Sequence, residues 1–188
     1  MKPKAPFWAC QGIIEVPRYS FTRDDIVYPD EFDAFIAKLP NLLLKALACL
    51  LYLTGCRISE ALALTWQNIG VSEDPPGLLL SIPTLKKRAK GPVRPRREIV
   101  IPASSKYYRL LLDYLQVAPR SNIFPVSRHY VKKAFRATGF PISAHVLRHS
   151  RLTLMARQGA DITSLLSLHG GEARALMKYT HEKRVIVS

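Results

Sequence analysis

The chain has 188 residues, 48% of them hydrophobic, which excludes a wholly disordered protein because so apolar a chain can offset its ordering entropy by burial. Lysine and arginine number 28 against 14 acidic residues. The resulting net charge of +14 favours a polyanionic partner, with nucleic acid ahead of an anionic membrane, although a merely basic soluble protein of the ribosomal type stays open on composition alone.

Cysteine usage and hydropathy argue against a disulfide-bonded, zinc-binding or membrane protein. Cys10, Cys49 and Cys56 include no CxxC pair, so the sequence supports neither a disulfide framework nor a zinc site, and a reducing cytoplasm fits best. The most apolar run, residues 42–53, contains a lysine and is shorter than the ~20 residues that span a bilayer. It therefore predicts a buried helix, and no membrane association is expected.

The N-terminal segment, residues 1–20, contains three prolines and lacks the continuous apolar run of a signal peptide. We predict an extended arm or linker there, followed by one domain over residues 21–188. Thr22 is the candidate N-cap of a first helix, in which apolar side chains recur at helical spacing: Phe32, Phe35, Ile36 and Leu39.

The middle of the chain changes from helical to β-compatible sequence. Gly55 is the expected left-handed end of the 42–53 helix, and residues 57–66 predict a further helix. Two β-compatible runs, 78–82 and 98–101, flank a long basic and proline-rich connection, which predicts an extended antiparallel hairpin.

The remaining sequence predicts helices separated by clear boundary residues. Residues 105–116 and 127–138 have helical patterns, the second with a basic face. Ser143 and Asp161 are candidate N-caps, and Gly159 and the Gly170–Gly171 pair are candidate breaks. The predicted fold class is mainly α with a small antiparallel β element (α+β).

Several side chains suit phosphate chemistry. Arg57 opens a predicted helix, where its planar fork can face a phosphate, and Glu60 either orients that guanidinium or is a surface carboxylate. His145 and Arg148 lie one helical turn apart and pair a proton carrier with a cation. Tyr179 in the last predicted helix would need neighbouring cations or a base to act as a nucleophile.

Three segments that contain these residues resemble, in order, the signatures of the tyrosine recombinases, also called phage-type integrases. They are TGCRISEALALTWQNI (54–69), HVLRHS (145–150) and LMKYTH (176–181). The resemblance spans roughly residues 21–181 and implies the catalytic-domain fold of that family. It also implies a site-specific recombinase activity that breaks and rejoins DNA.

The resemblance implies a role for each matching residue. Arg57 and Arg148 would clamp the scissile phosphate, His145 would serve in acid–base chemistry and phosphate binding, and Tyr179 would form a 3′-phosphotyrosyl enzyme. The family's hairpin lysine, the general acid, corresponds to Lys86, chosen over Lys87 because it stands closer to the strand.

A further histidine that supports the phosphate in the family corresponds to His169. The family usually has Leu-Gly-His before its last helix, whereas this chain reads LHGG over residues 168–171, so His169 lies one residue further from Tyr179. If the register is kept instead, Gly170 occupies the histidine position. Val146 also stands where many members have Asp.

The family's chemistry implies no metal ion, no ATP and no other cofactor, because arginines, a lysine and histidines around a phosphodiester can replace a metal as electrostatic stabiliser. It implies double-stranded DNA as substrate, a homotetramer on synapsed duplexes and a nucleoid-associated cytoplasmic location, and it leaves open whether accessory proteins take part. Typical members carry an N-terminal core-binding domain, and only a short arm precedes Phe21 here, as in the small recombinases that invert fimbrial promoter segments.

Basic side chains outside these signatures are predicted to contact the DNA backbone, because counterion release offsets their mutual repulsion. A solvated basic loop is the alternative for the hairpin. The predicted DNA-binding residues are Lys87, Arg88, Lys90, Arg94, Arg96 and Arg97 on the hairpin, and Lys132, Lys133 and Arg136 on the basic helix.

Two other functions stay open. One is a type IB topoisomerase-like enzyme that relaxes DNA by the same chemistry. The other is a DNA-binding accessory or regulatory protein of the same fold with weak or lost cleavage, which the LHGG shift motivates.

Overall fold

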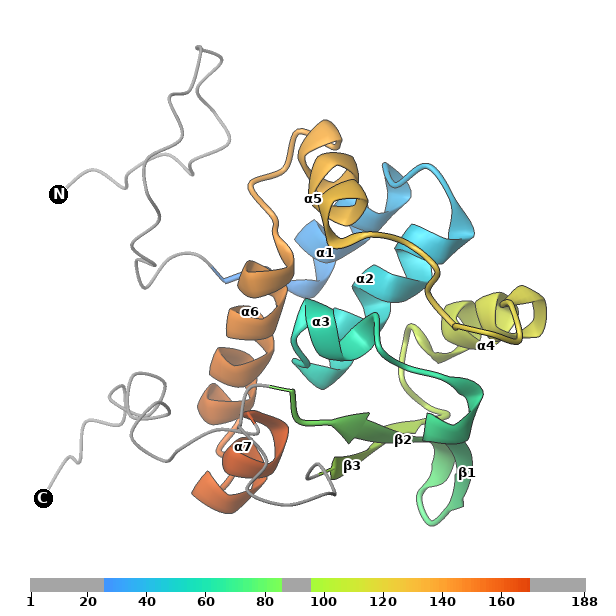
Figure 1. Cartoon of the computed structure of the whole chain (residues 1–188). Helices are drawn as coiled ribbons and strands as arrows, with labels where there is room; N and C mark the ends of the chain where they lie inside the picture. Colours follow the sequence, from blue (N-terminus) through green and yellow to red (C-terminus); the bar gives the residue numbers. More distant parts are fainter. Residues whose placement is uncertain (1–25, 86–95, 170–188) are drawn as a thin grey trace, which may run out of the picture.

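The computed structural model describes residues 26–85 and 96–169 (Figure 1). These residues form helices around a small sheet, in the order α1 Pro29–Ala37, α2 Leu42–Thr54, α3 Ile58–Ala61, β1 Ile69–Glu73, β2 Pro76–Pro83, β3 Arg96–Pro102, α4 Tyr108–Val117, α5 Arg128–Ala137, α6 Ala144–Arg157 and α7 Ile162–His169. The predicted fold class, mainly α with a small antiparallel β element, is confirmed. None of the helices in these ranges is long and apolar enough to cross a membrane.

Helix α2 is the centre of the core. Its sequence is apolar on nearly all sides, and it packs against α1, α3, α4, α6 and β3. Asn41 caps its start by accepting a hydrogen bond from the Leu44 backbone N–H at 2.9 Å, and Gly55 ends it with a φ of 59°. The predicted buried helix and its left-handed terminal glycine are therefore confirmed.

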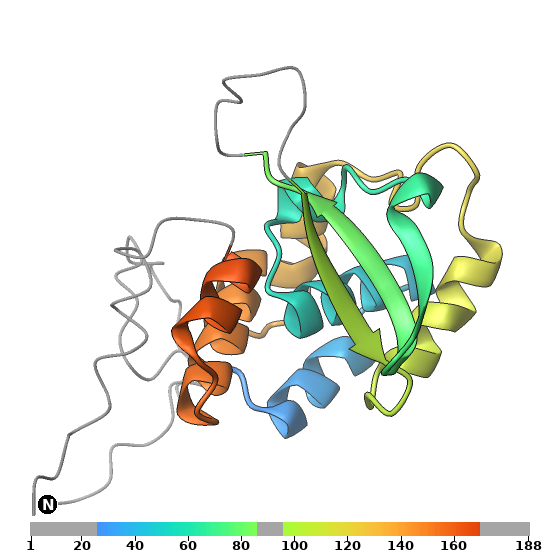
Figure 2. The same ribbon diagram turned by 90° about the horizontal axis from the view of Figure 1, so that it is seen from below.

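The sheet is antiparallel, with strand order β1-β2-β3. In the pairing of β2 with β3, Leu80 lies opposite Ile99 and Ile82 lies opposite Arg97. Buried side chains of β2 pack toward the helices, which cover one face of the sheet (Figure 2). The two predicted hairpin strands are confirmed, and β1 is an additional strand that the sequence pattern did not indicate.

Aromatic side chains fix α1 to its neighbours. Phe32 stacks on Tyr52 of α2 with ring centroids 4.1 Å apart, and Phe35 meets Phe135 of α5 edge-on at 5.0 Å. Both phenylalanines of α1 are fully buried. The helix predicted from the apolar spacing of this segment is therefore confirmed as α1, which begins at Pro29, ends at Ala37 and faces the core.

The prediction of one helix over residues 57–66 is wrong in length. Helix α3 ends at Ala61, and a separate 3-10 turn follows at Trp66–Asn68. The Thr65 backbone N–H donates to the Asn68 side chain at 2.9 Å, and the Leu64 carbonyl accepts from the Ile123 backbone N–H at 3.3 Å. These bonds hold Leu64 in the core and replace further helical bonds.

The predicted boundaries of the last helices agree with the structure. Ser143 caps α6 by accepting from the Val146 backbone N–H, and Gly159 follows the end of α6 with a φ of 85°. Asp161 accepts from the Ser164 backbone N–H at 2.8 Å at the start of α7. Thr22 as N-cap of the first helix is wrong, because α1 begins at Pro29 and its N-cap residue is Tyr28. The predicted arm over 1–20 and the Gly170–Gly171 break lie outside the described residues.

Candidate active site

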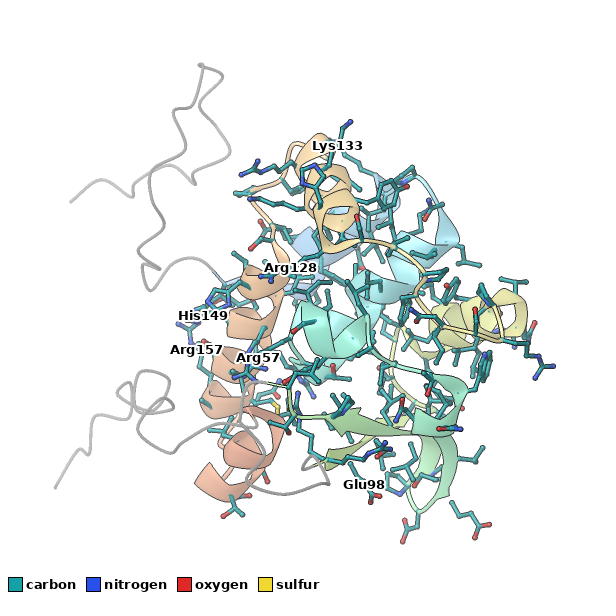
Figure 3. All side chains as sticks on the ribbon, viewed as in Figure 1. Arg57, Glu98, Arg128, Lys133, His149 and Arg157 are labelled. Atoms are coloured by element: carbon teal, nitrogen blue, oxygen red, sulfur yellow. The ribbon has the colours of Figure 1, made fainter. Side chains whose placement is uncertain are left out.

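The junction between α2 and α3 is the structural centre of the candidate site. The left-handed Gly55 turns the chain, Cys56 is fully buried, and Arg57 is the N-cap of α3 with extended backbone angles. The Arg57 side chain keeps 22% of its surface exposed. In Figure 3 Arg57 lies between α3 and α6, on the side of the molecule that also carries His149 and Arg157.

Arg148 reaches this junction from the middle of α6. The side chain is buried, with 5% of the residue exposed, and its Nη1 donates to the carbonyl oxygen of Gly55. Helix α6 is held in place nearby by Ser150, whose hydroxyl accepts from the Val27 backbone N–H at 2.9 Å. The arginines of two sequence signatures that are far apart in the chain are thus brought to one turn.

Glu60 orients Arg57 and is no surface carboxylate, which settles the alternative that the sequence left open. The residue is fully buried. Its Oε1 accepts from Arg57 Nη1 at 2.9 Å, and its Oε2 accepts from the Arg57 backbone N–H at 2.8 Å and from Arg97 Nη2 at 2.6 Å. Burial by itself would raise the pKa of Glu60, but the hydrogen bonds from Arg97 and Arg57 and the charge of Arg97 hold it below its ordinary value of 4.5.

The Glu60→Gln variant is expected to lower the free energy of unfolding by about 2–3 kcal/mol near neutral pH, because an amide cannot accept all the bonds that the carboxylate accepts. Since the folded-state pKa is lowered, this stabilisation is present above pH 4.5 and is lost as the pH falls through the folded pKa. The wild-type and variant free energies should therefore converge in acid.

Urea denaturation of both proteins at a series of pH values measures this convergence. Glu98→Gln, which changes an exposed carboxylate on β3, is the matched control, with an expected change within about 0.5 kcal/mol. A Glu60→Gln difference that stays constant down to the acid limit of folding would show that the ionised carboxylate does not stabilise the fold.

Cys56 shows how closely the cations gather. Burial raises the pKa of its thiol to about 11, and the charges of Arg97 and Arg148 both oppose this rise. One carboxylate, Glu60, stands among Arg57, Arg97 and Arg148. The described part of the site therefore has an excess of positive charge, and because Arg97 and Arg148 are buried, this charge is less screened by water than on an open surface.

His145 lies in the first turn of α6 and is exposed, one turn before the buried Arg148. Its position at the solvent side of the helix, next to the Ser143 cap, suits contact with a ligand that approaches from outside. The structure thus places His145 and Arg148 on one helix, as predicted.

His169 is the last residue of α7, and only its backbone is described. The preceding Leu168 packs near the junction, since a Cβ added at Gly55 would lie 3.4 Å from Leu168 Cδ2 and 3.4 Å from Arg151 Cγ. Helix α7 also contacts β3. The backbone of His169 therefore belongs to the same region as Arg57 and Arg148.

The other predicted site residues are distributed as follows. Lys132, Lys133 and Arg136 are exposed on α5, and Arg96 is exposed at the start of β3. Lys86, Lys87, Arg88, Lys90, Arg94 and Tyr179 lie outside the described residues.

Arg97 differs from its prediction as a DNA contact. The side chain is 7% exposed and paired with Glu60, so it is not part of an exposed basic surface. The alternation along β3 was the available signal, because Arg97 shares a strand face with the apolar Ile99 and Ile101. Sequence reasoning also missed the Gly55 carbonyl, for which no side-chain pattern gives a signal.

In the described residues, no group of three or more His, Cys, Asp or Glu side chains is arranged to hold a metal ion. What the arrangement offers is a set of guanidinium groups on rigid elements with an imidazole one helical turn away. The sequence profile of the Phage integrase family matches residues 26–184, which include all of these groups. The chain belongs to the phage integrase family.

Solved structures of similar fold agree with this membership. The XerH site-specific recombinase bound to its difH substrate in a pre-cleavage complex superposes with a TM-score of 0.64 at 19% identity, over 85% of this chain and 51% of XerH. The XerA recombinase gives a TM-score of 0.64 at 18% identity, over 90% of this chain and 63% of XerA.

The Tn1549 transposon integrase in complex with circular intermediate DNA gives a TM-score of 0.61 at 14% identity, over 82% of this chain and 60% of that chain. This phage integrase family member thus spans between half and two thirds of the length of these three proteins. The comparison with curated proteins gives no significant match.

Proposed function

We propose that the protein is a site-specific DNA recombinase or integrase that cleaves and rejoins DNA through a 3′-phosphotyrosyl intermediate, without a metal ion or ATP. The observation that carries the proposal is the bond from Arg148 to the carbonyl of Gly55. It holds the arginines of two separate signatures at one junction, where their charges can act on a single phosphate. Membership of the phage integrase family supports the same chemistry.

In the proposed reaction Arg57 and Arg148 bind the non-bridging oxygens of the scissile phosphate. The phenolic oxygen of Tyr179 attacks phosphorus and loses its proton as the new P–O bond forms, with His145 supporting the proton transfer. The bond to the 5′ oxygen breaks, and Lys86 donates a proton to this leaving group. Attack by another 5′-hydroxyl reverses the step, and the phosphotyrosine bond conserves the energy for rejoining.

His169 is proposed as a second imidazole that supports the phosphate. The position of α7 next to Gly55 favours this role, because its end lies in the same region as the two arginines. The additional residue between His169 and Tyr179, compared with the usual spacing, would be accommodated by the Gly170–Gly171 pair.

The proposed substrate is double-stranded DNA, and the relatives solved with DNA support it. The exposed cations of α5, of which Figure 3 labels Lys133, would bind the phosphate backbone. The proposed backbone contacts are Lys87, Arg88, Lys90, Arg94, Arg96, Lys132, Lys133 and Arg136. A homotetramer on two synapsed duplexes of nucleoid DNA, with accessory proteins, would complete the reaction.

A covalent adduct on nicked DNA tests the proposal. The sequence bound most tightly is first selected from random duplexes, and versions with a nick near each position are then incubated with the full chain. A nick lets the cleaved strand diffuse away, so that the phosphotyrosyl adduct accumulates and resists denaturation in detergent. Supercoil relaxation without recombinant products would favour the topoisomerase-like function, and tight binding with no adduct under any condition would favour the regulatory one.

A further inference from the structure

Arg97 is an arginine in the sheet that faces the core. Only 8% of the residue is exposed, whereas its neighbours Arg96 and Glu98 are both exposed. Figure 3 shows Glu98 on the outer side of the sheet. Arg97 lies directly opposite the fully buried Ile82 of β2, so its side chain projects from the face of the sheet that packs on the helices.

The bonding of Arg97 joins β3 to the start of α3. Its Nη2 donates to Glu60 Oε2 at 2.6 Å, and the same oxygen accepts from the Arg57 backbone N–H at 2.8 Å. The other oxygen, Oε1, accepts from Arg57 Nη1 at 2.9 Å. The Glu60 carboxylate is therefore held between two arginines, one from the strand and one from the candidate site.

This arrangement is an inefficient way to stabilise a fold. Arg97 Nε and Nη1 are buried and have no hydrogen-bond partner within the described ranges, so the guanidinium gives up hydration that one bond to Glu60 only partly offsets. Buried ion pairs of this kind contribute little net stability compared with apolar side chains of similar size. Their advantage is positional, because charge-assisted bonds fix the rotamers of both partners.

We propose that Arg97 is a positioning residue that fixes Glu60 and, through it, the Arg57 guanidinium, and that it does not contact DNA. The inference rests on the proposed function in one respect, that Arg57 binds the scissile phosphate. Its consequence is that the sheet and the phosphate-binding arginine move together, since β3 is linked to α3 through one carboxylate. With Arg97 removed, Glu60 keeps its two bonds to Arg57 but loses the bond that ties its carboxylate, and with it the Arg57 guanidinium, to β3.

Two measurements separate a positioning role from a DNA contact. The first is the slope of log binding constant against log salt concentration, whose magnitude falls by about 0.9 for each phosphate that the protein no longer neutralises. The second is the rate of adduct formation on nicked DNA at saturating protein. For Arg97→Met we expect an unchanged slope and a rate lower by about 10- to 100-fold, as for misplacement of a reacting group.

Two exposed arginines provide the comparison. Arg96→Met, which removes the exposed neighbouring cation, is expected to lower the magnitude of the slope by about 0.9. Arg109→Met on α4, which removes an 81% exposed side chain paired with Asp113, should change neither quantity. A lowered slope and an unchanged rate in Arg97→Met would make it a backbone contact and overturn the inference.

Arg97→Gln keeps the test decisive if the methionine variant does not fold. The amide is polar and uncharged, but its nitrogen lies at about the position of arginine Nε, which has no partner among the described residues, so it does not replace the bond from Nη2 to Glu60. A positioning role predicts, as for methionine, an adduct rate lower by about 10- to 100-fold with an unchanged salt slope. A DNA contact predicts a slope lowered by about 0.9 for glutamine as well.

A double-mutant cycle tests the linkage without any cleavage assay. Arg97→Met and Arg57→Met act on the same carboxylate, so their effects on the free energy of unfolding should be non-additive. Additive effects would overturn the linkage whether or not the protein cleaves DNA. If wild type forms no adduct, the proposed function fails, and non-additivity would still establish the structural link.

Discussion

The Tyr179→Phe variant is expected to abolish the covalent adduct with nicked DNA, lowering its formation by more than about 10³-fold, while DNA binding stays nearly unchanged. The substitution removes one hydroxyl and keeps the aromatic ring, so the bulk of the side chain and the charge of the protein are preserved. The result would assign the nucleophile, because the other proposed groups bind the phosphate or move protons and none can replace the attacking oxygen.

The measurement is a denaturing gel of labelled nicked duplex after incubation with each protein, alongside a filter-binding assay. Tyr108→Phe on α4 is the matched control, since α4 lies on the side of the molecule away from α6 (Figure 1). An adduct that persists in Tyr179→Phe would place the nucleophile elsewhere. An adduct that depends on Tyr179 makes His169→Ala the next variant, because it tests the altered spacing before the last segment.

The structure explains why some of the site could be predicted from sequence and some could not. Arg57 and Arg148 were found because they are tied to local signals: a glycine that ends one helix, and a histidine one turn earlier on another. Each of these signals indicates the local structure around one arginine, but not which residues contact it in the fold. The bond that joins them, from Arg148 to a backbone carbonyl, is invisible in the sequence because every residue carries a carbonyl.

Arg97 shows a different limit of prediction from sequence, which concerns whether a charged side chain is exposed or buried. In the sequence it is one of many basic residues around a hairpin, and counting charge placed it with the others on the surface. The strand period of two puts it on the opposite face from Arg96, and only the position of Glu60 decides whether a buried arginine there is tolerated. A carboxylate 37 residues earlier in the chain thus determines how this residue is used.

The helix after Arg57 shows how tertiary contacts shorten a predicted element. Helical spacing continues to Trp66, but α3 ends at Ala61, after which the Leu64 carbonyl accepts from the distant Ile123 backbone N–H and the Thr65 backbone N–H donates to the Asn68 side chain. Within this short helix, Glu60 lies in the first turn, and its side chain accepts a hydrogen bond from the Arg57 backbone N–H. The start of α3 thus fixes the position of Glu60 beside Arg57. Strand β1, by contrast, is a five-residue edge strand with a glycine, too short for a clear alternating pattern.

Arg148→Ala is expected to lower the rate of adduct formation at saturating DNA by about 10²- to 10³-fold, the usual effect of removing one group that stabilises developing charge. The variant should also lower the free energy of unfolding by about 1–3 kcal/mol, because the buried carbonyl of Gly55 is deprived of a donor. Urea denaturation establishes the range in which the variant is folded, and single-turnover cleavage is then measured within that range.

Arg148→Lys separates charge from geometry. A lysine keeps the positive charge, but its compact ammonium lacks the planar fork of arginine. Arginine has five N–H donors, more than the Gly55 carbonyl alone can accept, so donors remain for a phosphate. We therefore expect the lysine variant to bind DNA with the wild-type salt slope and to recover only a small part of the cleavage rate. Full recovery would show that charge at this position suffices, and the bond that joins α6 to the α2–α3 junction would then serve the fold alone. Partial recovery would mean that the same guanidinium both holds the junction and presents its fork to the phosphate.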